Sequence, residues 1–134
     1  MIKLIVGLKG SGKTKAIVDL ANAKVAETKG CIVFVEKGCS LLHEVKHQVR
    51  LLNAEEYHID DASKLYGFVA GNFGSNFDVT DIFIDSTLKI CGNVEALSAF
   101  LDNVAAFSAT HPVNFVMTIS ASADDIPERF KQFI

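Results

Sequence analysis

The stretch GLKGSGKT, from Gly7 to Thr14, constrains this chain more than any other part of its sequence. It matches the pattern G-x-x-x-x-G-K-[ST] in full. An apolar run at residues 3–6 comes before it, and a segment with apolar residues at helical spacing follows it. A glycine-rich loop between a buried strand and a helix binds phosphate well, because backbone N–H groups and the positive end of the helix dipole point at the ligand. We therefore expect a strand–loop–helix unit that binds a phosphorylated ligand.

Each loop position has a physical reason in this interpretation. Glycines allow the backbone conformations that direct successive N–H groups inward, and Ser11 is small enough to leave room for a ligand. Lys13 is expected to reach the β- and γ-phosphates and to act in catalysis, and Thr14 to offer a hydroxyl to Mg²⁺. The predicted ligand-binding residues of this segment are Gly7, Lys9, Gly10, Ser11, Gly12, Lys13, Thr14 and Lys15.

A second motif is DIFIDS, in which Asp85 follows an apolar strand. Ligands of open α/β sheets bind at the carboxyl ends of the strands, which is where Asp85 would emerge. A carboxylate at this place can hold Mg²⁺ through the waters of the ion. The alternative is an Asp that caps the turn after its strand. We predict Thr14 and Asp85 as the metal ligands, with Asp85 also counted as catalytic.

Short apolar runs alternate with helical patterns along the rest of the chain. Apolar throughout, these strands are typical of a parallel sheet covered on both faces. We predict one domain, residues 1–134, folded as a three-layer α/β/α sandwich around a mostly parallel sheet of five strands. The expected strands are residues 3–6, 31–35, 49–52, 81–85 and 113–119, and the expected helices are 13–28, 40–48, from a cap at Asp60 or Asp61 to 70, from a cap at Asn93 to 107, and a short one from Pro127; residues 71–76 are expected to be a loop.

Composition excludes several classes of protein. With 134 residues, 49% of them hydrophobic and 22% charged, the chain is globular rather than disordered. Its net charge of −3 disfavours sequence-independent binding to nucleic acid, which normally needs a basic face. Three cysteines without a C-x-x-C pair fit reduced thiols, and no stretch approaches a membrane span. We expect a cytoplasmic protein.

The two motifs and the strand–helix rhythm resemble the P-loop NTPases, in particular their RecA-like and thymidine-kinase-like branch. The chain is also similar to small P-loop ATP-binding proteins of Firmicutes. The resemblance implies a Walker A loop at Gly7–Thr14 and a Walker B aspartate at Asp85. It also implies a further strand between the two that carry the motifs, whose polar tip, Ser120 or Thr118, faces the γ-phosphate.

The chain departs from that family after Asp85. Many ATPases of this branch place there a Glu that activates the attacking water, but here the residue is Ser86, and a hydroxyl is a poor general base near neutral pH. The resemblance offers a substitute in Glu36, which follows the strand after the predicted P-loop helix. We predict Glu36 as the catalytic carboxylate, with a solvated strand-end Glu as the equal alternative.

Phosphoryl transfer also needs positive charge that stabilises the transition state, and an arginine finger often supplies it. Arg50 and Arg129 are the only arginines. Arg129 could reach into a neighbouring subunit of a homo-oligomer, although a surface Arg on a terminal helix is the commoner case.

Residues 43–47, HEVKH, match the zinc-protease pattern H-E-x-x-H. Lys46 puts a charge where zinc-protease helices generally have none, and no third ligand follows at a suitable spacing. We expect an exposed polar helix face here.

The sequence thus predicts Mg²⁺-dependent nucleotide binding, with ATP favoured over GTP because no N/T-K-x-D motif is present. A slow ATPase or ATP-driven switch is the first expectation. The alternatives are a small-molecule or nucleoside kinase, and a non-hydrolysing module that controls a protein partner.

Overall fold

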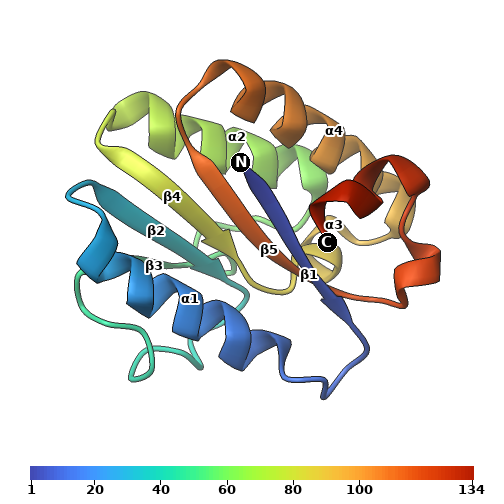
Figure 1. Cartoon of the computed structure of the whole chain (residues 1–134), viewed down its shortest axis with the longest axis horizontal. Helices are drawn as coiled ribbons and strands as arrows, with labels where there is room; N and C mark the ends of the chain where they lie inside the picture. The colour runs from blue at the N-terminus through green and yellow to red at the C-terminus, as the bar shows by residue number, and fades with distance from the viewer.

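The computed structural model describes all 134 residues. The chain forms five strands and four α-helices. They mostly alternate along the chain (Figure 1). The strands are β1 (Ile2–Gly7), β2 (Cys31–Glu36), β3 (Val49–Asn53), β4 (Val79–Ile84) and β5 (Asn114–Ser120). The helices are α1 (Lys13–Glu27), α2 (Ala62–Ser75), α3 (Thr87–Cys91) and α4 (Val94–Thr110), and two 3₁₀ segments, η1 (Ala123–Asp125) and η2 (Glu128–Phe133), end the chain.

All five strands form one sheet in the order β1-β5-β4-β2-β3, and every neighbouring pair is parallel. The predicted α/β class and five-stranded sheet are confirmed, with a sheet that is wholly rather than mostly parallel. The strand β5 lies between β1 and β4, so a further strand separates the two that carry the motifs, as the family resemblance implied.

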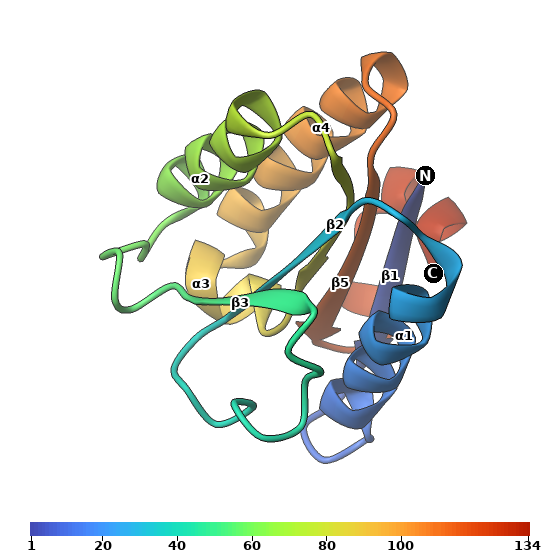
Figure 2. The ribbon, with the colours of Figure 1, turned by 90° about the vertical axis from the view of Figure 1, so that its left-hand side faces the viewer.

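The two faces of the sheet are covered unequally. Figure 2 shows α2, α3 and α4 on one face and α1 on the other. Successive residues of a strand point to opposite faces, so in β2 Val33 and Val35 join the core under α2 and α4, whereas Ile32 and Phe34 join the core under α1. The first core holds 25 buried residues and the second only 10.

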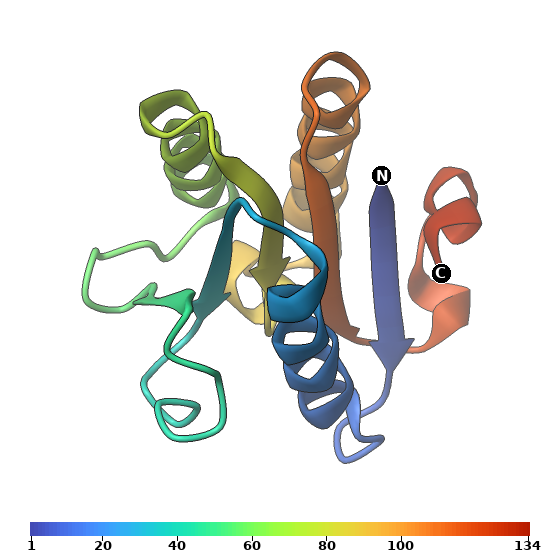
Figure 3. The same cartoon turned by 60° about the vertical axis from the view of Figure 1, so that its left-hand side comes forward.

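The strand β1 forms one edge of the sheet, and the last residues of the chain lie beside it (Figure 3). Phe130 and Ile126 of this C-terminal segment are buried in the larger core together with Leu4 of β1. The segment therefore shields an edge that carries the glycine-rich loop at its end.

Two local predictions are wrong. Residues 40–48 form turns rather than a helix. The helix α2 continues to Ser75 through the predicted loop, because Phe73 extends the buried stripe of Leu65 and Val69. The one-turn helix α3 was not expected, whereas the short helix predicted from Pro127 is present as the 3₁₀ segment η2. No helix of the chain combines the length and the hydropathy that a bilayer crossing requires.

The predicted helix cap at Asn93 is confirmed, and it yields a stability prediction. The side chain of Asn93 accepts a hydrogen bond of 2.8 Å from the backbone N–H of Ala96, in the first turn of α4. We expect Asn93→Ala to lower the free energy of unfolding by about 1 kcal/mol, because an N–H at the helix end loses its partner. Urea unfolding of Asn93→Ala beside Asn93→Asp, which keeps an acceptor, measures this, and equal losses in both variants would contradict it.

Candidate functional site

The loop between β1 and α1 has the backbone geometry that its glycines predict. Gly10 and Gly12 adopt φ angles of 83° and 86°, the left-handed region that favours glycine. Gly7 meets a different demand, since a Cβ atom there would lie 2.5 Å from the Oγ of Ser11. The helix α1 then begins at Lys13 with no side-chain cap, which leaves the N–H groups of its first turn available to an anion.

Lys13 is largely buried, and its ammonium group is held by the loop itself. Its Nζ donates a hydrogen bond of 2.9 Å to the carbonyl of Leu8 and one of 3.4 Å to the Oγ of Ser11. Only 9% of the residue is exposed. The cation is thus positioned among the loop's own oxygens, next to the uncapped end of α1.

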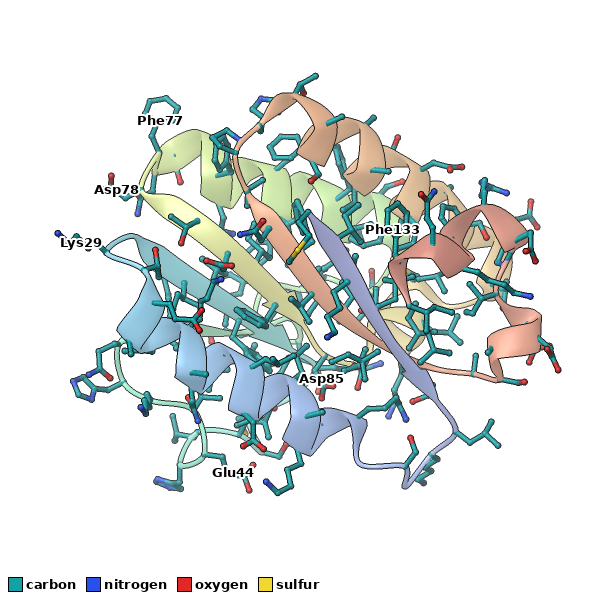
Figure 4. All side chains as sticks on the ribbon, in the orientation of Figure 1. Lys29, Glu44, Phe77, Asp78, Asp85 and Phe133 are labelled. Carbon is teal, nitrogen blue, oxygen red and sulfur yellow. The ribbon has the colours of Figure 1, made fainter.

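Asp85 follows β4 and lies against the first turn of α1. Its two carboxylate oxygens are 3.2 and 3.4 Å from the Oγ1 of Thr14. Thr118 of β5 donates a hydrogen bond of 2.6 Å to Oδ1 of Asp85, and the Oγ1 of Thr118 accepts one of 2.8 Å from the backbone N–H of Ser86. Figure 4 places Asp85 at the end of the sheet opposite to Lys29 and Asp78. A hydroxyl and a fixed carboxylate within hydrogen-bond distance are hard oxygen donors of the kind that Mg²⁺ prefers, so these residues fit the ion.

These groups border one open cavity of about 750 Å³. Its walls come from the glycine-rich loop, the first turn of α1, the ends of β4 and β5, and α3. The lining residues are Lys9, Gly10, Gly12, Lys13, Thr14, Lys15, Asp85, Ser86, Leu88, Lys89, Gly92, Thr118 and Ser120. The cavity therefore brings together most of the residues predicted from the sequence; Gly7 and Ser11 lie within the loop but not in the wall.

Glu36 reaches the predicted edge of the sheet, but its carboxylate does not line the cavity. Val35 is paired with Ile84, so Glu36 and Asp85 leave neighbouring strands at the same level. The Oε1 of Glu36 accepts hydrogen bonds of 3.1 and 3.2 Å from the backbone N–H and the hydroxyl of Ser40, and its Oε2 accepts one of 3.2 Å from the N–H of Leu41. The residue is 2% exposed, which corrects the alternative of a solvated strand-end Glu. These contacts hold the loop after β2 and do not support the predicted catalytic role.

Neither arginine contributes to the cavity within this chain. Arg129 pairs with Asp102 of α4 through two hydrogen bonds, 3.1 Å from Nε and 3.0 Å from Nη2. These hydrogen bonds, together with the guanidinium charge, lower the pKa of Asp102. Arg50 lies exposed on the edge strand β3. The prediction of Arg129 as a finger into a neighbouring subunit stays a prediction, since only one chain is present.

The H-E-x-x-H residues do not form a metal site. His43, Glu44 and His47 are exposed on the turns between β2 and β3, and no three acidic, histidine or cysteine side chains of the chain are grouped so that they could hold a metal. The side-chain amide of Asn22 fixes this segment to α1, because it donates to the carbonyl of Glu44 and accepts from the N–H of Lys46, each at 2.9 Å. Figure 4 shows Glu44 beside α1. The polar exposure was expected correctly, but the helix was not.

Sequence reasoning missed the wall that α3 contributes. Leu88, Lys89 and Gly92 line the cavity opposite the glycine-rich loop. A five-residue helix is too short to produce a periodic signal, and no motif marks its lysine. The only available signal was position, because a segment that directly follows a predicted metal-binding aspartate must start near the ligand.

Comparison with known proteins shows the fold alone. No family model and no curated protein matches the sequence. The monomer form, with ATPγS, of TcpA, the conjugation coupling protein of pCW3, is structurally similar, with a TM-score of 0.52 at 14% sequence identity. The match covers 99% of this chain and 46% of TcpA, so this chain spans less than half the length of that protein. Together with the sheet order, the similarity shows an α/β fold with a five-stranded parallel sheet flanked by helices, which resembles the fold of TcpA.

Proposed function

We propose that this protein binds a nucleoside triphosphate, preferentially ATP, together with Mg²⁺. The observation that carries the proposal is the meeting of Lys13 and Thr14 with Asp85 in one cavity of about 750 Å³. Lys13 and Thr14 end the glycine-rich motif and Asp85 lies 71 residues after Thr14, so their convergence is a product of the fold. ATPγS in the structurally similar TcpA supports an adenine nucleotide as the ligand.

Each group has a defined task in this proposal. The loop N–H groups and the uncapped start of α1 bind phosphate oxygens, and Lys13 adds a charge-assisted hydrogen bond. Thr14 and Asp85 hold Mg²⁺, directly or through its waters, and the ion when bound neutralises charge on the terminal phosphates. Thr118 keeps the Asp85 carboxylate in a single orientation by donating to Oδ1.

Hydrolysis is expected to be slow. A general base must lie within hydrogen-bond reach of the proton that it removes, directly or through one water. Glu36 is the residue that the sequence predicts as this base. Its carboxylate accepts three hydrogen bonds from Ser40 and Leu41 and is closed to solvent. This arrangement favours a slow ATPase or an ATP-driven switch, and it equally supports a module that binds nucleotide without cleaving it.

The proposal is tested by calorimetric titration of the protein with ATP, with Mg²⁺ and then with EDTA, followed by an assay of phosphate release. We expect Mg²⁺ to strengthen ATP binding by about tenfold, the effect of one charge-assisted contact. Asp85→Asn should bind ATP without the metal as the wild type does and lose the gain from Mg²⁺, because the amide still accepts from Thr118 but carries no charge. No binding by the wild type at millimolar Mg-ATP would refute the proposal.

A further inference from the structure

The wall of the cavity opposite the glycine-rich loop carries a cation whose role no sequence motif assigns. Lys89 of α3 lines the same cavity as Lys13 and Asp85. The two lysines come from helices on opposite faces of the sheet, since Lys13 begins α1 and Lys89 lies in α3 (Figure 2). A ligand with its phosphates in the loop would therefore have Lys89 beyond it.

The backbone beneath Lys89 is held firmly. Ser86 adopts a left-handed conformation with φ 60° and opens the turn, and Ile90 donates a hydrogen bond of 3.1 Å to its carbonyl. Thr87 is fully buried and donates from Oγ1 to the carbonyl of Ile84. The N–H of Gly92 closes the turn on the carbonyl of Leu88 at 2.8 Å. The position of Lys89 is thus fixed by its neighbours, and only its side chain has freedom.

Lys89 also carries a charge that nothing in the chain neutralises. No carboxylate lies within ion-pair distance of its ammonium, and it makes no side-chain hydrogen bond. Lys15, in the first turn of α1, differs because its ammonium forms an ion pair with Asp19. The hydrogen bond to Asp19 and the charge of that residue raise the pKa of Lys15. The cavity holds four lysines but one acidic side chain, Asp85. An anion is the ligand that this balance favours.

The other three lysines of the cavity, Lys9, Lys13 and Lys15, belong to the glycine-rich loop and the first turn of α1, and both arginines lie elsewhere. Arg129 is engaged with Asp102 and Arg50 lies on β3 at the far edge of the sheet. Within one chain, Lys89 is therefore the one cation of the cavity that comes from outside the glycine-rich loop and α1.

We propose that Lys89 binds the terminal phosphate of the nucleoside triphosphate, and that it thereby distinguishes a triphosphate from a diphosphate. This inference rests on the proposed function. The loop N–H groups bind phosphates that ATP and ADP share, and Lys13 reaches both the β- and γ-phosphates. Lys89, on another element, adds a contact that is gained only when the third phosphate is present. Lys89 is, in this view, a specificity-determining residue supplied in cis.

The test compares ATP and ADP affinities, each with Mg²⁺, for the wild type, Lys89→Met, Lys89→Arg and Lys29→Met. Lys29 is an exposed lysine without an ion-pair partner at the opposite end of the sheet, so its variant controls for the loss of one charge. We expect Lys89→Met to weaken ATP binding by about tenfold and ADP binding by less than about twofold, as the loss of one charge-assisted hydrogen bond predicts. Lys89→Arg should retain most of the preference for ATP, and Lys29→Met all of it.

The outcomes separate the two proposals. A wild type that binds neither nucleotide refutes the proposed function and this inference with it. A wild type that binds ATP, with Lys89→Met changing ATP and ADP affinity equally or not at all, refutes the inference alone. Thermal unfolding of each variant shows whether a loss of affinity comes from a loss of fold. If Lys89→Met does not fold, Lys89→Gln, which also removes the charge, gives the answer.

Discussion

Lys13→Met will lower the affinity for ATP by about a hundredfold or more and leave the protein folded. Lys13 is the one lysine of the chain that is buried, and its ammonium lies within the loop, bonded to the carbonyl of Leu8 and near the Oγ of Ser11. Hydrogen bonds that involve a charged group contribute about 1.5–3 kcal/mol each, so the loss of contacts to two phosphates amounts to at least two factors of ten. Methionine keeps the length and the apolar character of the stem, which limits the cost to the fold.

Calorimetric titration with Mg-ATP measures this loss. Lys29→Met is the matched control, because it removes the same charge from the opposite end of the sheet and should bind as the wild type does (Figure 4). If Lys13→Met bound within fivefold of the wild type, the loop would not be the phosphate site. The test does not depend on hydrolysis, so it applies equally to an ATPase and to a binding module.

Glu36→Ala will lower the free energy of unfolding by about 3 kcal/mol. The substitution removes a carboxylate that accepts three hydrogen bonds, and it leaves the N–H of Leu41 without its partner in a residue that is 4% exposed. An unsatisfied buried donor costs about 1–3 kcal/mol, and the vacated side-chain volume adds to it. The loop after β2 is expected to loosen first, because the lost hydrogen bonds are those that hold it. The packing of Leu41 and Val45 against α1 would weaken with it.

Urea unfolding of Glu36→Ala and Glu44→Ala gives the comparison, because Glu44 is an exposed glutamate of the same loop and should change stability little (Figure 4). A second variant separates structure from catalysis. Glu36→Gln keeps one acceptor oxygen and should lose less stability than Glu36→Ala. If it kept wild-type stability and ATP binding but lost all phosphate release, Glu36 would have the catalytic role that the sequence predicts.

The fold could be predicted from the sequence because short local sequence patterns mark its main strands and helices. Uniformly apolar strands predicted the parallel sheet, whereas the strand between the two that carry the motifs was implied by the resemblance to the RecA-like branch. Asp61 and Asn93 marked two helix starts correctly, since each accepts a hydrogen bond from a first-turn N–H. These features depend on a few adjacent residues, which is the range over which sequence patterns are informative.

The errors arise where distant side chains replace local preference. Residues 40–48 carry a helical pattern, yet Glu36 and Asn22 bind their backbone groups from outside and hold them as turns. Two glycines suggested that the helix after Asp61 ends at residue 70. The helix continues past them because the ring of Phe73 packs edge-on against that of Phe107 in α4, with 5.6 Å between the ring centroids. In the site, the same limit hid Lys89, whose place opposite the loop depends on how α3 folds back after Asp85.

The unequal covering of the sheet has a consequence for how this molecule opens. The glycine-rich loop and α1 rest on the smaller core, which has 10 buried residues against 25 on the other face. Regions with less buried apolar surface open at a lower free energy than the whole domain. The loop, α1 and the turns that Asn22 ties to it therefore form the half of the protein that fluctuates first. A ligand that binds there adds its free energy of binding to the free energy needed to open the weaker half. It thereby reduces the difference in opening free energy between the two faces of the sheet.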